Sequence, residues 1–106
     1  MPVVVAELAA LVGGNIETAP YEQMGSVELA KVVTETLKDK DAVLMANHGL
    51  LAVGPDLETA FANAVIVEEG AKVACYAQSI GKLRAMPEED CRGLRQWVIE
   101  KYGQQE

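Results

Sequence analysis

Residues 42–54 read AVLMANHGLLAVG, and the predicted sheet is built around them. It contains two short apolar runs, AVLMA and LLAV, which do not alternate with polar residues. Runs of this length are too short for helices and are typical of strands covered on both faces. Asn47, His48 and Gly49 separate the runs and form the predicted turn, where glycine allows a positive φ. The sequence therefore predicts two strands inside a sheet, with the single histidine of the chain presented at a strand end.

An amphipathic helix is predicted before these strands, over residues 26–39. Ser26 can cap its first turn, because a serine hydroxyl accepts a hydrogen bond from a free backbone amide, and Glu28 lies favourably near the positive helix end. Apolar residues recur at spacings of three and four, which predicts one packed stripe with the charged residues facing solvent. That stripe consists of Val27, Ala30, Val33 and Leu37.

A longer helix is predicted after the strands, over residues 57–80, which contain no proline. Asp56 is expected to cap this helix, with Glu58 in its first turn. At 1.5 Å per residue its apolar stripe would be about 26 Å long and would cover the sheet. The stripe consists of Leu57, Ala60, Phe61, Ala64, Val67, Ala71 and Ala74.

The two ends of the chain contain further elements. The start, MPVVVAELAALVGG, predicts a β-branched strand and then a short helix that ends at Gly13 and Gly14. The segment NIETAPY predicts another short strand, which Pro20 closes because proline donates no hydrogen bond. Near the other end, Pro87 followed by acidic residues predicts the start of a last amphipathic helix. Its inward face is expected to carry Cys91, Leu94, Trp97 and Val98.

Three short strands with three or four helices predict an α/β arrangement, in which helices cover a central sheet. The chain has 106 residues, of which 50% are hydrophobic and 24% charged, and this composition indicates a folded body. No repeat or long linker divides it, so we expect a single domain over residues 1–106. A sheet this small leaves strand edges that need a neighbour.

Charge and composition exclude several classes of partner. The chain carries 9 basic and 16 acidic residues, a net charge of -7, and no basic stripe that could neutralise a phosphate backbone. Nucleic acid is therefore not an expected partner. No segment reaches the roughly 18 uninterrupted apolar residues of a membrane helix, and the chain start lacks the basic region and cleavage site of a signal peptide. We expect a cytoplasmic protein that does not bind membranes, with small molecules or other subunits as partners.

The two cysteines predict neither a zinc site nor a disulfide framework. Cys75 and Cys91 lie 16 positions apart, with no CxxC motif and no paired histidines. Both are expected to be reduced and to pack as small buried hydrophobic residues.

The stretch VLMANHGLLAVGPDLETAFANAVIVEEGAKV, residues 43–73, resembles the class II aldolase and adducin family. That family includes L-fuculose-1-phosphate aldolase and L-ribulose-5-phosphate 4-epimerase. In it, an NHG or HHG turn between strands precedes a glycine, a capped helix start and a glutamate-bearing helix. The matching features here are Asn47-His48-Gly49, Gly54, DLETA and Glu68, and GGNIETAPYEQMGSVELA extends the resemblance over residues 1 to about 80. The resemblance implies a partial three-layer α-β-α fold, with this chain corresponding to the C-terminal half of the family domain.

The resemblance also implies a metal-dependent reaction on a sugar phosphate. Family members bind a divalent metal, usually zinc, through an HxH pair in the preceding half and through the histidine of the NHG turn. His48 is by this correspondence the third metal ligand. A metal with an open position polarises a carbonyl and stabilises the enediolate that forms when the adjacent carbon-carbon bond breaks. This chain has one histidine and no HxH, and the family's acid/base glutamate also belongs to the preceding half, so Glu68 and Glu69 receive no catalytic role.

The ending EKYGQQE resembles the C-terminal tail of fuculose aldolases, in which a tyrosine is functional. By this resemblance Tyr102 would donate a proton to the departing aldehyde across a subunit interface. The alternative is that Tyr102 extends the packed face of the last helix. A second family tyrosine has no counterpart, since Ala6 and Glu7 stand near its expected position.

Two functions remain open. The first is a metal-dependent aldolase or epimerase acting on a sugar phosphate, in which this chain supplies His48 and a complementary N-terminal half supplies HxH. The second is a non-catalytic, truncated or adducin-like module that retains the oligomerisation surfaces and lacks the metal site. Assembly is expected in both cases, because the family forms homo-oligomers and because open strand edges and apolar surface favour association.

Overall fold

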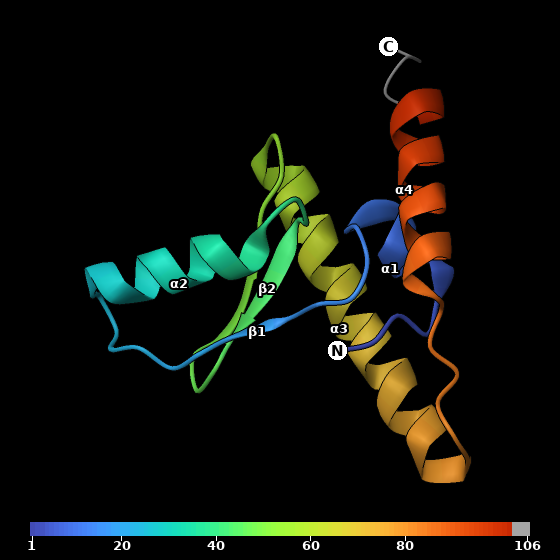
Figure 1. Cartoon of the computed structure of the whole chain (residues 1–106), viewed down its shortest axis with the longest axis horizontal. Helices are drawn as coiled ribbons and strands as arrows, with labels where there is room; N and C mark the ends of the chain where they lie inside the picture. The colour runs from blue at the N-terminus through green and yellow to red at the C-terminus, as the bar shows by residue number, and fades with distance from the viewer. Residues whose placement is uncertain (103–106) are drawn as a thin grey trace.

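The computed structural model describes the backbone of residues 1–102 and the side chains of residues 1–101. It is a mixed α/β structure with a small sheet, as predicted (Figure 1). The elements in chain order are α1 (Ala6–Leu11), β1 (Thr18–Ala19), α2 (Val27–Leu37), β2 (Ala42–Met45), β3 (Gly49–Ala52), α3 (Leu57–Ile80) and α4 (Glu88–Tyr102). No helix in the described part of the chain is long and apolar enough to cross a membrane.

The sheet has the strand order β1-β2-β3. The two apolar runs form an antiparallel hairpin, in which Met45 lies opposite Gly49, and β1 pairs in parallel with β2. The prediction of these strands is confirmed. Their expected position inside the sheet is wrong for β3, which forms an edge of the sheet over the described residues. A continuous apolar run indicates that both faces of a strand are covered by other layers. It does not indicate whether the strand has a hydrogen-bonded neighbour at each edge.

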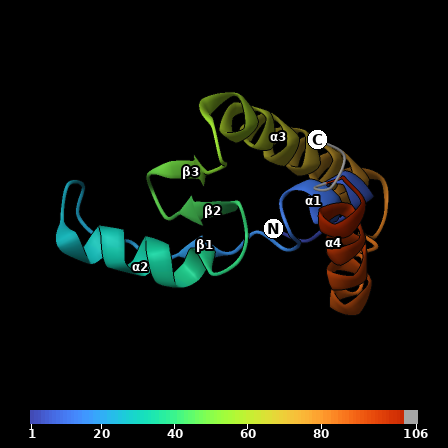
Figure 2. The ribbon, with the colours of Figure 1, turned by 90° about the horizontal axis from the view of Figure 1, so that it is seen from above.

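Helices cover both faces of the sheet, which gives the predicted three layers (Figure 2). Successive residues of a strand point to opposite faces. Val43 of β2 accordingly packs in a cluster with Val33 of α2, whereas the preceding Ala42 packs in a cluster with Val67 of α3. The second cluster is the larger one and includes the fully buried Leu8 of α1.

The strand expected at the chain start is absent. Residues 1–5 precede α1 without joining the sheet. The amide of Val3 donates to Asn15 Oδ1 at 3.1 Å, and the carbonyl of Val3 accepts from the Met86 amide at 2.7 Å. These partners come from two separate loops, so Val3 satisfies its backbone outside the sheet. Val3 is nevertheless fully buried, which explains its apolar character.

Both predicted helix caps are confirmed. The hydroxyl of Ser26 accepts from the Leu29 amide at 3.1 Å at the start of α2. The Asp56 carboxylate accepts from the Thr59 amide at 2.7 Å at the start of α3. Each bond satisfies one of the backbone donors that the first turn of a helix leaves free.

The packed faces of α2 and α3 differ from the predicted stripes in their first turns. Val33 and Leu37 of α2 pack against the sheet, but Val27 is 81% exposed and Ala30 is also exposed. In α3, Leu57 is 86% exposed and Phe61 is 69% exposed, while Val67 and Ala74 are buried as expected. Apolar residues occupy more of the surface of each helix than the sheet and the other helices cover. A prediction from the helical period alone therefore gives a packed face that is too wide.

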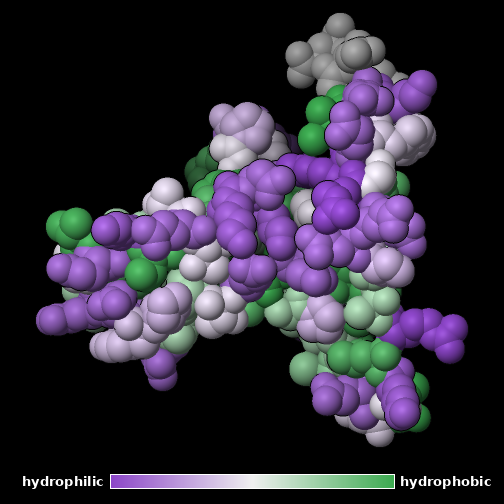
Figure 3. Space-filling view, in the orientation of Figure 1, coloured by the Kyte–Doolittle hydropathy of each residue, from purple (hydrophilic) through white to green (hydrophobic). Residues whose placement is uncertain are grey.

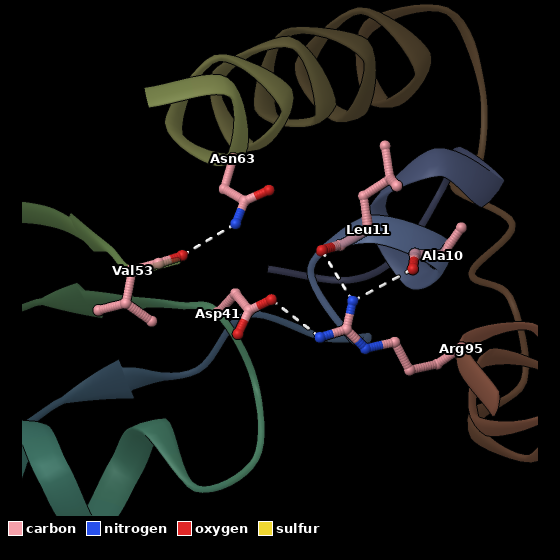
Figure 4. Close-up of polar contacts among 6 residues, drawn as sticks. All are labelled: Ala10, Leu11, Asp41, Val53, Asn63 and Arg95. Carbon is pink, nitrogen blue, oxygen red and sulfur yellow. Dashed lines mark hydrogen bonds and ion pairs between the residues drawn. The ribbon is translucent and has the colours of Figure 1, made fainter. Parts of the chain in front are cut away.

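Asn63 is the buried polar residue among the described ones, and the stripe prediction overlooked it. It lies on the packed face of α3 with Val67, Gly70 and Ala74. Its Nδ2 donates to the carbonyl oxygen of Val53 at 2.9 Å, directly after β3 (Figure 4). The hydrogen bond offsets the cost of burying the amide and links α3 to the residue that follows β3.

The last helix starts after Pro87 with three acidic residues, as predicted, and packs beside α1. Cys91 is 2% exposed and Leu94 and Val98 are partly buried, but Trp97 is 47% exposed. Both cysteines are free thiols, and Cys75 is exposed on α3, contrary to its expected burial. Cys75 lies on a face of α3 that no other described element covers. A cysteine is small enough for a core, but it is buried only where another element packs against it.

Candidate functional site

His48 lies in the turn between β2 and β3. Its amide donates to the Met45 carbonyl at 2.9 Å, which closes the hairpin. Asn47 has a φ of 66° and Gly49 a φ of 132°, so the turn uses the left-handed region at two positions. A side chain on Gly49 would meet no atom within 4 Å, so the backbone conformation and not a contact requires this glycine. The predicted turn and the position of His48 at a strand end are confirmed, and the structure shows that the residue is exposed.

The imidazole of His48 has two partners. Its Nε2 lies 2.8 Å from the carbonyl oxygen of Glu22. The ring of Tyr21 stacks on it, with 5.4 Å between the ring centroids and 11° between the planes. Because a carbonyl oxygen only accepts, Nε2 is the donor in this hydrogen bond. Nδ1 has no hydrogen-bond partner among the described residues.

The described part of the chain does not supply a complete metal site. No group of three or more histidine, cysteine, aspartate or glutamate side chains within it could hold a metal ion. A catalytic zinc site needs three protein ligands, and His48 is one candidate nitrogen ligand with no second and third ligand beside it. The donor set of these residues therefore does not fit the metal that the sequence resemblance implies.

The glutamates of α3 form an exposed, solvated face. Lys72 Nζ lies 3.8 Å from Glu68 Oε1 and 3.4 Å from Glu69 Oε1, one helical turn apart. All three side chains are more than half exposed, and such pairs contribute little to stability. Nothing in this arrangement gives either carboxylate a catalytic environment.

Tyr102 is the last residue of α4. Its side chain and residues 103–106, which hold the rest of the EKYGQQE ending, lie outside the described residues. The catalytic role assigned to Tyr102 by resemblance therefore stays a prediction. Ala6 and Glu7 are exposed at the start of α1.

A small cavity of ≈ 120 Å³ lies where the loop after α1 meets α4. Lys40 and Cys91 line it, together with Gly13 and Gly14, which both have positive φ. Burial raises the pKa of the Cys91 thiol, and the carboxylates of Asp90 and Glu88 raise it further. A thiol held neutral in this way is a poor nucleophile. The cavity is therefore no candidate for cysteine catalysis.

Arg95 joins α4 to the rest of the structure (Figure 4). One terminal nitrogen of its guanidinium lies 2.8 Å from Asp41 Oδ2. The other donates to the carbonyl oxygens of Ala10 and Leu11, at 3.2 and 2.9 Å, at the end of α1. No local sequence pattern marks Arg95, because its three partners lie 54 to 85 positions away in the sequence.

The chain is similar to a known protein family and to several of its members. A family model described as Class II Aldolase and Adducin N-terminal domain matches residues 1–75. The chain is 39% identical over 101 residues to a 5-deoxy-D-ribulose 1-phosphate aldolase of Bacillus thuringiensis serovar kurstaki, a match that covers 95% of this chain and 47% of the relative. It is 30% identical over 96 residues to a 5-methylthioribulose-1-phosphate/5-deoxyribulose-1-phosphate aldolase of Rhodospirillum rubrum, covering 90% of this chain and 42% of that protein.

The fold also matches a solved structure of an L-fuculose 1-phosphate aldolase. The TM-score is 0.82 at 31% sequence identity, and the match covers 91% of this chain and 46% of the other. The chain thus spans about half the length of the proteins that it resembles.

Proposed function

The chain belongs to the class II aldolase and adducin family, and on this premise we propose that it forms part of an aldolase that cleaves a sugar phosphate by a retro-aldol reaction. The observation that carries the proposal is the 39% identity to a 5-deoxy-D-ribulose 1-phosphate aldolase across 95% of the chain. The fold similarity to an L-fuculose 1-phosphate aldolase supports the same class of substrate.

The reaction determines what an active site must provide. A base removes the proton of the hydroxyl group β to the carbonyl, the bond between the α and β carbons breaks, and the fragment with the β carbon leaves as an aldehyde. The electron pair of that bond remains on the other fragment as an enediolate, which a proton then converts to the second carbonyl product. The site must therefore stabilise an anion and move two protons.

The proposal assigns His48 to a metal site that this chain completes only together with other residues. A bound zinc or other divalent ion would stabilise the enediolate, and His48 is the one candidate ligand for it among the described residues. The missing ligands would come from a complementary, HxH-bearing half of the family fold. The exposure of His48 supports this assignment, because a second polypeptide segment can reach the imidazole from solvent. Tyr102 is proposed as the proton donor to the aldehyde oxygen in the reverse, condensing direction, because cleavage itself removes a proton from that oxygen.

A complementation assay tests this function. The chain is mixed with the HxH-bearing half of a family aldolase, and the release of dihydroxyacetone phosphate from a ketose 1-phosphate is measured with and without zinc. The proposal predicts zinc-dependent cleavage by the mixture and none by either part alone. A mixture that neither binds zinc stoichiometrically nor cleaves any ketose 1-phosphate would contradict it.

The second candidate function is a non-catalytic, adducin-like oligomerisation module. The lack of a three-ligand cluster among the described residues favours this alternative. Cleavage of a sugar phosphate by the chain alone would rule it out, whereas stable assembly of an inactive mixture would support it.

Self-association into a homo-oligomer is part of either proposal. Figure 3 shows apolar surface at the outer end of α2 and at the far end of α3. Val27 is 81% exposed in the first region and Ile80 is 90% exposed in the second. Exposed apolar surface of this kind favours association. Sedimentation velocity at high protein concentration tests this expectation, and a strict monomer would contradict it.

A cytoplasmic location belongs to the same proposal, and the free state of both cysteines supports it.

A further inference from the structure

The outer edge of β3 is open over the described residues. The strand order β1-β2-β3 gives β2 a neighbour on each side and leaves β3 with one. The carbonyl of Asp41 accepts from the Val53 amide at 2.9 Å, so these two residues form a hydrogen-bonded pair at the end of the hairpin. Because such pairs alternate along an antiparallel ladder, the backbone amides and carbonyls of Leu50 and Ala52 point away from β2. The edge therefore presents backbone donors and acceptors in the arrangement that another strand requires.

This edge lacks the features that normally keep a strand from pairing further. Proteins protect exposed edges with charged side chains, proline or a bulge. Residues 49–53 read GLLAV, without a charged residue or a proline. The register of β3 against β2 advances one residue at a time, so β3 has no bulge. Such an apolar, unprotected edge is typical of a strand that has a neighbour in the assembled protein.

Both faces of β3 are already covered, which limits what the neighbour can be. Leu50 packs against the buried cluster that includes Val67 of α3, and Leu51 packs against the cluster that includes Val33 of α2. Figure 2 shows β3 as the outermost strand of the sheet, with α2 and α3 on opposite faces of that sheet. A strand added to this edge would extend the same three layers and would need helices over both of its own faces. A folded α/β segment meets this need, whereas an isolated extended peptide does not.

We infer that β3 pairs through this edge with a strand from the complementary half of the class II aldolase fold. The length of the relatives carries the choice of partner. The matched part is 47% of the 5-deoxy-D-ribulose 1-phosphate aldolase and 46% of the L-fuculose 1-phosphate aldolase structure, so more than half of each protein remains to supply strands and helices. The inference rests on the proposed function, in which a complementary half joins this chain, and it names the surface at which the two parts join.

Amide hydrogen exchange, resolved by nuclear magnetic resonance, tests the inference. The chain is measured alone and as the complex purified after co-expression with the HxH-bearing half of a family aldolase. In the chain alone, the amides of Leu51 and Val53 face β2 and exchange slowly, whereas those of Leu50 and Ala52 exchange fast. In the complex, exchange at Leu50 and Ala52 is expected to slow about tenfold or more, because each amide gains a backbone hydrogen bond.

Two results of this measurement would overturn the inference. The first is unchanged exchange at Leu50 and Ala52 in the complex. The second is slow exchange at both residues in the chain alone, together with a dimer in sedimentation velocity, because a second copy of the chain would then occupy the edge.

A proline at position 52 tests the same edge by substitution. Ala52→Pro removes one outward donor and retains the bonds to β2, since a strand edge tolerates proline where its nitrogen faces away from the ladder. Ala52→Val is the matched control, because it adds similar bulk and keeps the amide. Ala52→Pro is expected to weaken association with the complementary half about tenfold or more, whereas Ala52→Val associates as the wild type does. Equal association of the two variants would refute the pairing. Circular dichroism of each variant alone checks its fold, and the exchange measurement on the wild type decides the inference if Ala52→Pro does not fold.

The cleavage assay separates this inference from the proposed function. A complex that protects Leu50 and Ala52 but cleaves no ketose 1-phosphate would count against the proposed function and support the pairing. A complex that cleaves the substrate without protecting these amides would overturn the pairing and leave the proposed function intact. If the co-expressed parts form no complex, the inferred partner is wrong.

Discussion

The guanidinium of Arg95 and the carboxylate of Asp41 form an ion pair at 2.8 Å that ties the last helix to the start of the central hairpin. Both side chains are about three-quarters buried, at 23% and 28% exposure. The same guanidinium satisfies two carbonyls at the end of α1, where the partial negative charge of a helix terminus favours a cation. One side chain thus connects α4, α1 and the sheet.

Replacing Arg95 with alanine is expected to lower the free energy of unfolding by about 2 kcal/mol, because hydrogen bonds from a charged donor contribute more than neutral ones. The remaining exposure of the pair keeps the effect moderate. Urea denaturation followed by far-UV circular dichroism measures the change. Arg92→Ala is the control, since Arg92 pairs with Glu88 on the surface of the same helix. Equal effects of the two variants would contradict this role of Arg95.

Replacing Asn63 with leucine leaves the Val53 carbonyl without its donor. We expect a loss of about 1 to 3 kcal/mol in the free energy of unfolding, the usual cost of a buried group deprived of its hydrogen bond. Gln78→Leu, at an exposed position of the same helix, is the control. An Asn63→Leu variant as stable as the wild type would show that the bond does not hold α3 to the sheet.

The cap at the start of α3 predicts a dependence of stability on pH. The backbone amide of Thr59, and then its side chain, lower the pKa of Asp56 from its ordinary value of 3.8. Because the pKa is lower in the folded state, the ionised cap stabilises the protein above pH 3.8, and this contribution is lost as the pH falls through the folded pKa.

Asp56→Asn tests this prediction, because asparagine also caps helices but does not titrate. The variant should match the wild type near neutral pH and show a flatter loss of stability in acid. Asp56→Ala should be less stable than both at neutral pH. Identical acid unfolding profiles for the wild type and Asp56→Asn would refute the contribution of Asp56.

The two cysteines are expected to differ in reactivity. Cys75 is exposed, whereas Cys91 is 2% exposed and burial raises the pKa of its thiol. A thiol reagent should therefore modify one cysteine of the folded protein quickly and the second only on unfolding. Mass spectrometry of the modified peptides identifies them, and Cys75→Ser should abolish the fast phase. Fast modification of Cys91 in the folded protein would be inconsistent with its packing.

Local chemistry explains which elements could be predicted. The hairpin, the caps at Ser26 and Asp56 and the whole of α3 follow from signals within a few residues, and each is confirmed. The outer face of α3 was assigned wrongly at Phe61, because an apolar side chain indicates that a residue can be buried and does not show what lies against it. The strand expected before α1 was wrong because β-branched residues also suit a buried loop.

The contacts around His48 could not be predicted from the sequence for a different reason. The NHG turn identifies His48, but its link to Tyr21 depends on the register of a strand only two residues long. A register of this kind follows from the packing of the whole sheet and leaves no local pattern. The same holds for Arg95, whose partners come from two elements distant in the sequence.

The decisive experiment compares the cleavage of a ketose 1-phosphate between mixtures that contain the wild-type chain and mixtures that contain His48→Ala. If this chain supplies a metal ligand to a sugar-phosphate aldolase, the wild-type mixture releases dihydroxyacetone phosphate in the presence of zinc. The His48→Ala mixture then assembles equally well but loses both stoichiometric zinc and cleavage. Full zinc content and full activity in the His48→Ala mixture would contradict the account.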